Sequence, residues 1–172
     1  MTPTTIIIDT REPWPHPWEI HLPEAHFLRD GLETGDIALA ANRNLVVERK
    51  TVSDFLGSVT AGRERFEAEL RRSRVLDHFA IVIEGSMLDV IADSGGFTME
   101  SLFGTVAAFS RRWGVAIHFA GSERYAARLA WSILTQPLNE ANRLIKAAKT
   151  ADKKAARQAA TQVVGADGKM LY

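Results

Sequence analysis

The sequence contains no cysteine. This absence excludes a disulfide framework, a thiol nucleophile, and every zinc or iron–sulfur site that needs cysteine ligands. A chain of 172 residues, 46% of them hydrophobic, is nevertheless long enough to bury a stable core without cross-links. The composition therefore predicts one compact domain followed by a tail.

Long hydrophobic runs are also missing. Near the N-terminus the longest run covers only residues 6–8, whereas a signal-peptide core needs ~7–15 apolar residues and a membrane span needs ~20. We therefore expect a soluble protein that is cytoplasmic, nucleoid-associated or otherwise intracellular, with no membrane partner.

The chain has no net charge, because 21 Lys and Arg residues balance 21 Asp and Glu residues. No global positive field attracts nucleic acid or an anionic membrane. The distribution is uneven, since the residues from Glu140 onward carry a net charge of +4. This basic end has two interpretations that both stay open, a solvated Lys/Ala-rich helix or an arm that binds phosphates.

Apolar runs and helical spacing alternate along the chain. Strands are predicted at 4–9, 35–40, 44–48, 79–84 and 115–119, and helices at 51–57, 66–76, 87–92, 98–113, 123–134 and from 138 to about 160. Pro137 is predicted to stop a helix, and the end from residue 165 is predicted to fray. Strands interleaved with helices predict an α/β fold, with a domain at 1–136 and a basic Ala/Lys-rich helical tail at 137–172.

Charged residues continue two of these apolar strands. Asp9 ends the first strand, Asp36 opens a predicted hairpin, and Glu48 and Lys50 end its second strand. Residues two apart on a strand share a face, so Glu48 and Lys50 project together while Arg49 faces away. Two carboxylates and a lysine on one face would suit hydrolysis of a phosphodiester assisted by a divalent cation, most plausibly Mg²⁺.

A structural interpretation competes with this one. Two acids and a lysine within fifteen positions arise often by chance, and Glu-Arg-Lys is commonly the polar end of a strand. The context favours catalysis, because these charges extend strands predicted to be buried. Burying charge without a partner or a metal costs several kcal/mol.

The motifs around these residues resemble a known family. They are Asp9-Thr10-Arg11-Glu12 after an Ile-rich strand, Gly35-Asp36, Val47-Glu48-Arg49-Lys50 with Asp54 four residues on, and Gly62-Arg63. Together and in this order they resemble the nuclease domain of the XPF-type structure-specific endonucleases. The resemblance spans roughly residues 4–134.

The resemblance implies a restriction-endonuclease-like core, with a central mixed sheet flanked by helices and followed here by a helical tail. It also implies a DNA endonuclease that cuts flaps, forks or junctions in repair or recombination with Mg²⁺ or Mn²⁺. Carried over by position, Asp36 and Glu48 would be the metal ligands with Asp9 at the metal, and Lys50 would be the catalytic lysine. Arg49 and Asp54 would support catalysis, and Arg11 and Arg63 would contact DNA; Glu12 has no assigned role.

Two features leave alternatives open. Family members commonly carry a tandem helix-hairpin-helix module after the nuclease domain, and the segment after Leu134 is too short for one. A partner could supply DNA binding, and a homodimer or heterodimer through the nuclease domain is expected. The alternatives are a non-catalytic nuclease-fold subunit that binds DNA or a partner, and a nuclease of the same fold that acts on ordinary duplex or single strands.

Overall fold

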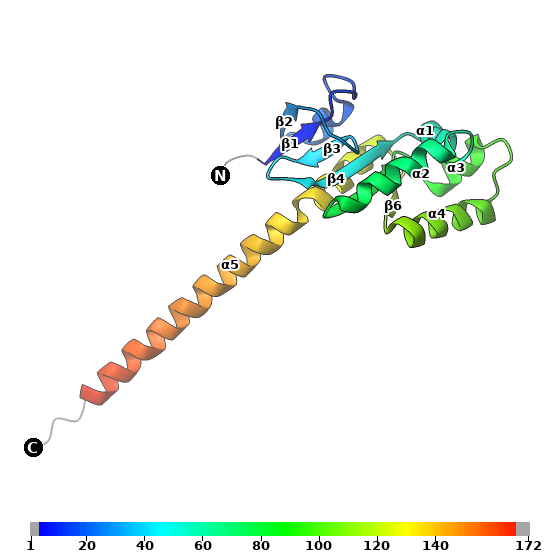
Figure 1. The fold of residues 1–172 in the computed structure, drawn as a ribbon. Helices are drawn as coiled ribbons and strands as arrows, with labels where there is room; N and C mark the ends of the chain where they lie inside the picture. The colour runs from blue at the N-terminus through cyan, green and yellow to red at the C-terminus, as the bar shows by residue number, and fades with distance from the viewer. Residues whose placement is uncertain (1–3, 168–172) are drawn as a thin grey trace, which may run out of the picture. The chain divides into compact units, whose positions relative to one another are not determined.

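A computed structural model describes residues 4–167, in which six strands form one mixed sheet (Figure 1). The strands are β1 (Thr5–Ile8), β2 (His26–Arg29), β3 (Ile37–Leu39), β4 (Asn42–Lys50), β5 (His78–Ile83) and β6 (Ala116–Phe119). Their spatial order is β2-β1-β3-β4-β5-β6. β3 pairs antiparallel with β1 and β4, and the other neighbours are parallel. The predicted mixed sheet and the hairpin of β3 and β4 are confirmed.

Helices follow most of the strands. They are α1 (Val52–Val59), α2 (Arg63–Arg72), α3 (Met87–Asp93), α4 (Met99–Trp113) and α5 (Glu123–Asp167), with the 3₁₀ turns η1 (Pro17–His21) and η2 (Ser73–Val75). Thr51, Ser86 and Thr98 begin α1, α3 and α4 by accepting a hydrogen bond from a backbone N–H of the first turn. Gly114, at φ +71°, ends α4 in the left-handed conformation.

The sheet is covered on both faces. On the face toward α1, α2 and α4, aromatic and branched side chains form one buried cluster, in which Phe66 and Phe109 meet edge to face with ring centroids 5.6 Å apart. The opposite face packs against η1, through Trp18 and Leu22, and against the first turns of α5, through Ala126 and Ala130. Double coverage explains why β5 is apolar at nearly every position.

Two local predictions differ from the structure. The helix predicted to run through residue 76 ends at Arg72, and Val75 is 83% exposed rather than buried. The weakly patterned stretch after Glu19 contains β2, which pairs in parallel with β1. As an edge strand, β2 is mostly exposed, so it lacks the apolar alternation that identifies a strand from sequence.

Pro137 lies inside α5 and does not stop it, so that prediction was wrong. A proline deprives the carbonyl of Ile133 of its helical donor, but the surrounding Ala, Leu, Lys and Arg residues favour helix strongly. α5 also includes residues 165–167, which were predicted to fray. The last residues of that prediction lie outside the described part of the chain.

The chain divides into two compact units, Met1–Leu134 and Thr135–Tyr172. The first unit contains the sheet and α1 to α4. The predicted functional boundary at residue 136 stays a prediction. No helix in the described part of the chain is long and apolar enough to cross a bilayer.

Gly35 determines how the chain enters β3. Its φ is +79°, and a Cβ atom here would lie 2.3 Å from Val46 Cγ1 and 3.2 Å from the Phe79 ring. Both the backbone conformation and the space therefore require glycine. Gly35 thereby sets the position of Asp36, the next residue.

We predict that Gly35→Ala lowers the free energy of unfolding by about 2–4 kcal/mol, because left-handed strain adds to overpacking. Gly104→Ala is the matched control, since Gly104 is exposed within α4 and a Cβ there meets nothing within 4 Å. The control should raise stability by about 0.5–1 kcal/mol. Urea denaturation measures both, and equal stability of Gly35→Ala and the native protein would contradict this account.

Candidate active site

Three carboxylates lie in a row across the neighbouring inner strands β1, β3 and β4, near one end of those strands. The strand register pairs Ile8 with Ile37 and Ile37 with Val47, and one further step brings Asp9 opposite Asp36 and Asp36 opposite Glu48. The backbone hydrogen bonds between β1 and β3 extend to this row, because the Asp9 N–H donates to the Asp36 carbonyl at 2.8 Å. The sheet register therefore brings together the three acids that are far apart in the sequence.

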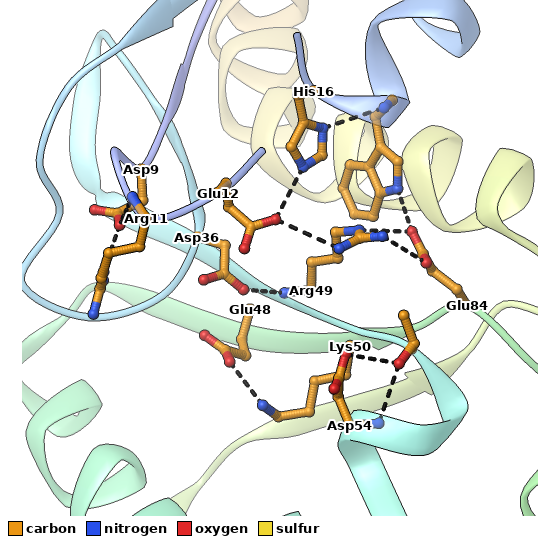
Figure 2. Close-up of polar contacts among 12 residues, drawn as sticks. Asp9, Arg11, Glu12, His16, Asp36, Glu48, Arg49, Lys50, Asp54 and Glu84 are labelled. Carbon is orange, nitrogen blue, oxygen red and sulfur yellow. Dashed lines mark hydrogen bonds and ion pairs between the residues drawn. The ribbon is translucent and has the colours of Figure 1, made fainter. Parts of the chain in front are cut away.

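Lys50 lies beside Glu48 on the same face of β4 (Figure 2). Its ammonium donates to Glu48 Oε1 at 2.9 Å and lies 4.7 Å from the centroid of the Phe66 ring. Both side chains are buried. Burial alone would lower the pKa of Lys50, but the charge of Glu48 and the hydrogen bond to it raise this pKa above its ordinary value. Lys50 is therefore a stable ammonium ion.

Asp36 and Glu48 each keep an oxygen that accepts no hydrogen bond from a backbone or cationic donor within residues 4–167. Asp36 Oδ2 accepts a hydrogen bond from the Arg49 backbone N–H at 2.8 Å, which leaves Oδ1. Glu48 Oε2 is buried and has no hydrogen-bond partner in the described part of the chain. Removal from water, together with the negative charge of Glu48, raises the pKa of Asp36 to about 9. A cation between these carboxylates would reduce their mutual repulsion and would give the unpartnered oxygen of Glu48 a ligand contact.

The donor set fits a hard divalent cation. Within residues 4–167 no three acidic or histidine side chains converge into a complete protein cage for a metal. Mg²⁺ seldom uses such cages, and it is usually held by one or two carboxylates with waters and substrate phosphate oxygens. Asp36 and Glu48 match that pattern.

Asp9 occupies the third place in the row with both oxygens engaged. Oδ1 accepts from the backbone N–H of Arg11 at 2.9 Å and from its Nε at 2.5 Å, and Oδ2 accepts from Leu32 N–H at 2.6 Å. Burial acts to raise the pKa of Asp9, but these hydrogen bonds lower it overall. Arg11 also donates to the carbonyl of Leu32. Asp9 thus ties the strand end to residues 31–35.

Arg49 points to the opposite face of the sheet. Its guanidinium donates twice to Glu84, at 2.8 and 2.9 Å, and Trp18 Nε1 donates to the same carboxylate at 2.6 Å. Glu12 lies 3.5 Å from Arg49 and 3.3 Å from Nε2 of the buried His16. Figure 2 shows this network beside the carboxylate row, from which Arg49 points away. Arg49 therefore anchors η1 and β5 to β4.

The remaining predicted site residues have local contacts. Asp54 accepts from the Thr51 hydroxyl at 2.7 Å at the beginning of α1, and Arg63 donates to Glu67 at 3.0 Å. Within the described residues, neither has a hydrogen bond or ion pair with Asp36. The spacing of Asp54 from the Glu-Arg-Lys motif is explained by helix capping, and the predicted roles of both residues stay predictions.

Glu69 is a site residue that the sequence interpretation missed. It comes from α2. Burial, the nearby charge of Glu48 and a side-chain hydrogen bond with Glu48 raise the pKa of Glu69 to about 7. Glu69 follows Phe66 by three residues and precedes Leu70, both of which are buried. That helical spacing was the available signal, because it points Glu69 toward the sheet.

The mixed sheet flanked by helices has the restriction-endonuclease-like fold. Residues 8–131 match the ERCC4 domain family, and the chain belongs to that family. The predicted fold class and the XPF-type resemblance are thereby confirmed.

Two solved structures have a similar fold. One is XPF from Aeropyrum pernix, with 24% identity and a TM-score of 0.65 over 77% of this chain and 61% of that chain. The other is XPF from Aeropyrum pernix in complex with DNA, with 22% identity and a TM-score of 0.63 over 80% of this chain and 66% of that chain. This chain thus spans less than two thirds of either one. No curated protein matches it.

The Arg49–Glu84 pair provides a test of the network on the opposite face. We predict that Glu84→Ala lowers the free energy of unfolding by about 3–5 kcal/mol, because a largely buried guanidinium loses its partner. The control is Arg112→Ala, which removes an exposed ion pair with Glu67 and should cost no more than about 1 kcal/mol. Chemical denaturation that gave equal losses for the two variants would refute an anchoring role.

Proposed function

We propose that this protein is a divalent-metal-dependent DNA endonuclease that hydrolyses phosphodiester bonds in branched DNA during repair or recombination. Membership of the ERCC4 domain family and the fold shared with a DNA-bound XPF structure support DNA as the substrate. One observation carries the chemistry: a buried, unpartnered oxygen of Glu48 lies next to Asp36 and to the ammonium of Lys50.

Asp36 and Glu48 would hold Mg²⁺ or Mn²⁺ through the two oxygens that the protein leaves unused. When bound, such a cation neutralises charge on the phosphoryl oxygens and lowers the pKa of a coordinated water. Asp9 lies adjacent in the row and keeps its neighbour Arg11 in place. A bound cation would offset the repulsion between Asp36 and Glu48 that raises the pKa of Asp36.

Lys50 contributes a fixed positive charge. One of its three N–H groups donates to Glu48, and the others remain for a phosphoryl oxygen of the substrate. Since Phe66 lies against the ammonium and limits water there, the charge acts in a medium of low dielectric constant. Lys50 would thus stabilise the negative charge that develops as the nucleophile attacks.

The preference for flaps, forks or junctions, and pairing with a second copy or a related chain through the nuclease domain, are proposed from the family. In such a complex Arg11 and Arg63 would contact DNA phosphates. Arg63 already donates to Glu67 and lies 5.0 Å from the centroid of the Phe109 ring. A contact of Arg63 with a DNA phosphate would therefore form on the surface of α2.

The substrate proposal is tested by cleavage of matched flap, fork, four-way-junction, duplex and single-stranded DNAs with Mg²⁺, with Mn²⁺ and with chelator. We expect cleavage that needs metal and that prefers branched DNA. Equal cleavage of duplex and branched DNA would overturn the branch preference. A folded protein that binds these DNAs without cutting any of them would favour a non-catalytic subunit.

The residue roles are tested by Glu48→Gln and Lys50→Ala. Each variant should lower turnover by at least about 100-fold. Glu48→Gln weakens the site that would hold the cation, and Lys50→Ala removes a positive charge beside the reacting phosphate. Calorimetric titration with Mn²⁺ separates their roles, since Glu48→Gln should weaken metal binding and Lys50→Ala should retain it.

Asp93→Asn is the matched control, because Asp93 is an exposed acid in α3; it should leave both turnover and metal binding unchanged. Near-normal cleavage by the folded Lys50→Ala variant would remove Lys50 from the mechanism.

A further inference from the structure

A groove of about 670 Å³ lies on the α2 side of the sheet. We name it the Arg72 groove, and it is lined by residues of three segments. They are residues 31–34 from the loop before β3, Arg43, Asn44 and Val46 from β4, and Arg72, Val75 and Leu76 from the end of α2 and the turn that follows it. Its volume is in the range that accommodates a small organic ligand.

The Arg72 groove adjoins the carboxylate row. Val46 and Glu48 share one face of β4, two residues and thus about 7 Å apart. Leu32 lines the groove and also donates its N–H to Asp9. On α2, Glu69 lies near Glu48, and Arg72 follows one helical turn later. A strand whose phosphate reached Glu48 would therefore have its next nucleotide at the groove.

The lining combines apolar side chains with two arginines, Arg43 and Arg72, and one exposed acid, Glu33. Val75 is 83% exposed although it is apolar. Within residues 4–167 Arg72 has no hydrogen-bond or ion-pair partner, although its charge acts on the nearby Glu69. Arg43, the other arginine of the wall, is held by Asp30 at 2.6 Å and by the carbonyl of Gly31. Arg72 is therefore the guanidinium that remains free for an anionic ligand.

We propose that the Arg72 groove binds one unpaired nucleotide of the DNA strand, directly beside the phosphate that is cut. This inference rests on the proposed nuclease function. The base would lie on Leu32, Val75 and Leu76, and Arg72 would pair with a phosphate or stack on the base. A paired base within a duplex hides both faces by stacking, so the groove would favour a nucleotide at a branch or in a single strand.

Binding without cleavage gives the first test. Fluorescence anisotropy with a labelled flap DNA in chelator compares Arg72→Ala with Arg74→Ala. Arg74 is the matched control because it is exposed and close in sequence but does not line the groove. Arg72→Ala should weaken binding by about five- to tenfold and lower the slope of log affinity against log salt by about 0.7. Equal effects of the two variants would overturn the proposal.

The absence of cysteine makes a second test possible. Val75→Cys introduces a single thiol into the groove, and Leu88→Cys introduces one on α3 at a site that is 71% exposed and outside the groove. The rate of alkylation by iodoacetamide is measured in chelator, with saturating single-stranded DNA or duplex. Single-stranded DNA should slow alkylation of Val75→Cys at least fivefold, while duplex should not, and Leu88→Cys should react equally throughout.

The outcomes separate this inference from the nuclease proposal. Metal-dependent cleavage with no protection of Val75→Cys by single-stranded DNA would overturn the groove and leave the nuclease proposal intact. Protection equal with duplex and single-stranded DNA would overturn the preference for an unpaired nucleotide. Protection by single-stranded DNA in a protein that cuts nothing would support the groove while the nuclease proposal fails.

Discussion

The register between β1, β3 and β4 is the constraint on which the site depends. Side chains alternate along a strand, so a slip of one residue would move every one of them to the other face. The native register places Asp9, Asp36 and Glu48 side by side, and the apolar residues of the same strands hold that register by filling the core. The burial of Ile7, Ala38 and Val46 therefore holds three acidic side chains side by side.

The sheet separates two arrangements of charge that are adjacent in sequence. On one face, the Glu48–Lys50 pair leaves one carboxylate oxygen without a partner. On the other, Arg49 is satisfied by Glu84, which Trp18 also supports. An incomplete set of partners suits a group that must receive a ligand, and a complete set suits one that must hold the fold. The motif Glu-Arg-Lys thus combines a reactive face with a structural anchor.

Residues 31–35 connect the carboxylate row to the surface around it. Leu32 hydrogen-bonds to Asp9 through its N–H and to Arg11 through its carbonyl, and Gly35 turns the chain into Asp36. The same loop forms one wall of the Arg72 groove. One loop therefore both orients two carboxylates and borders the groove.

Much of this protein was determined by local sequence. The apolar strands, the capped helices α1, α3 and α4, and the shared face of Glu48 and Lys50 follow from patterns within a few residues. The family motifs predicted the fold class as well. These features depend on neighbours along the chain, so the sequence alone was sufficient.

Tertiary structure decided the rest. It brought Glu69 beside Glu48, gave both oxygens of Asp9 to Arg11 and Leu32, and paired β2 with β1. It also ended α2 before Val75. None of these outcomes is specified by local spacing, because each depends on the balance between local preference and contacts from segments far apart in the chain.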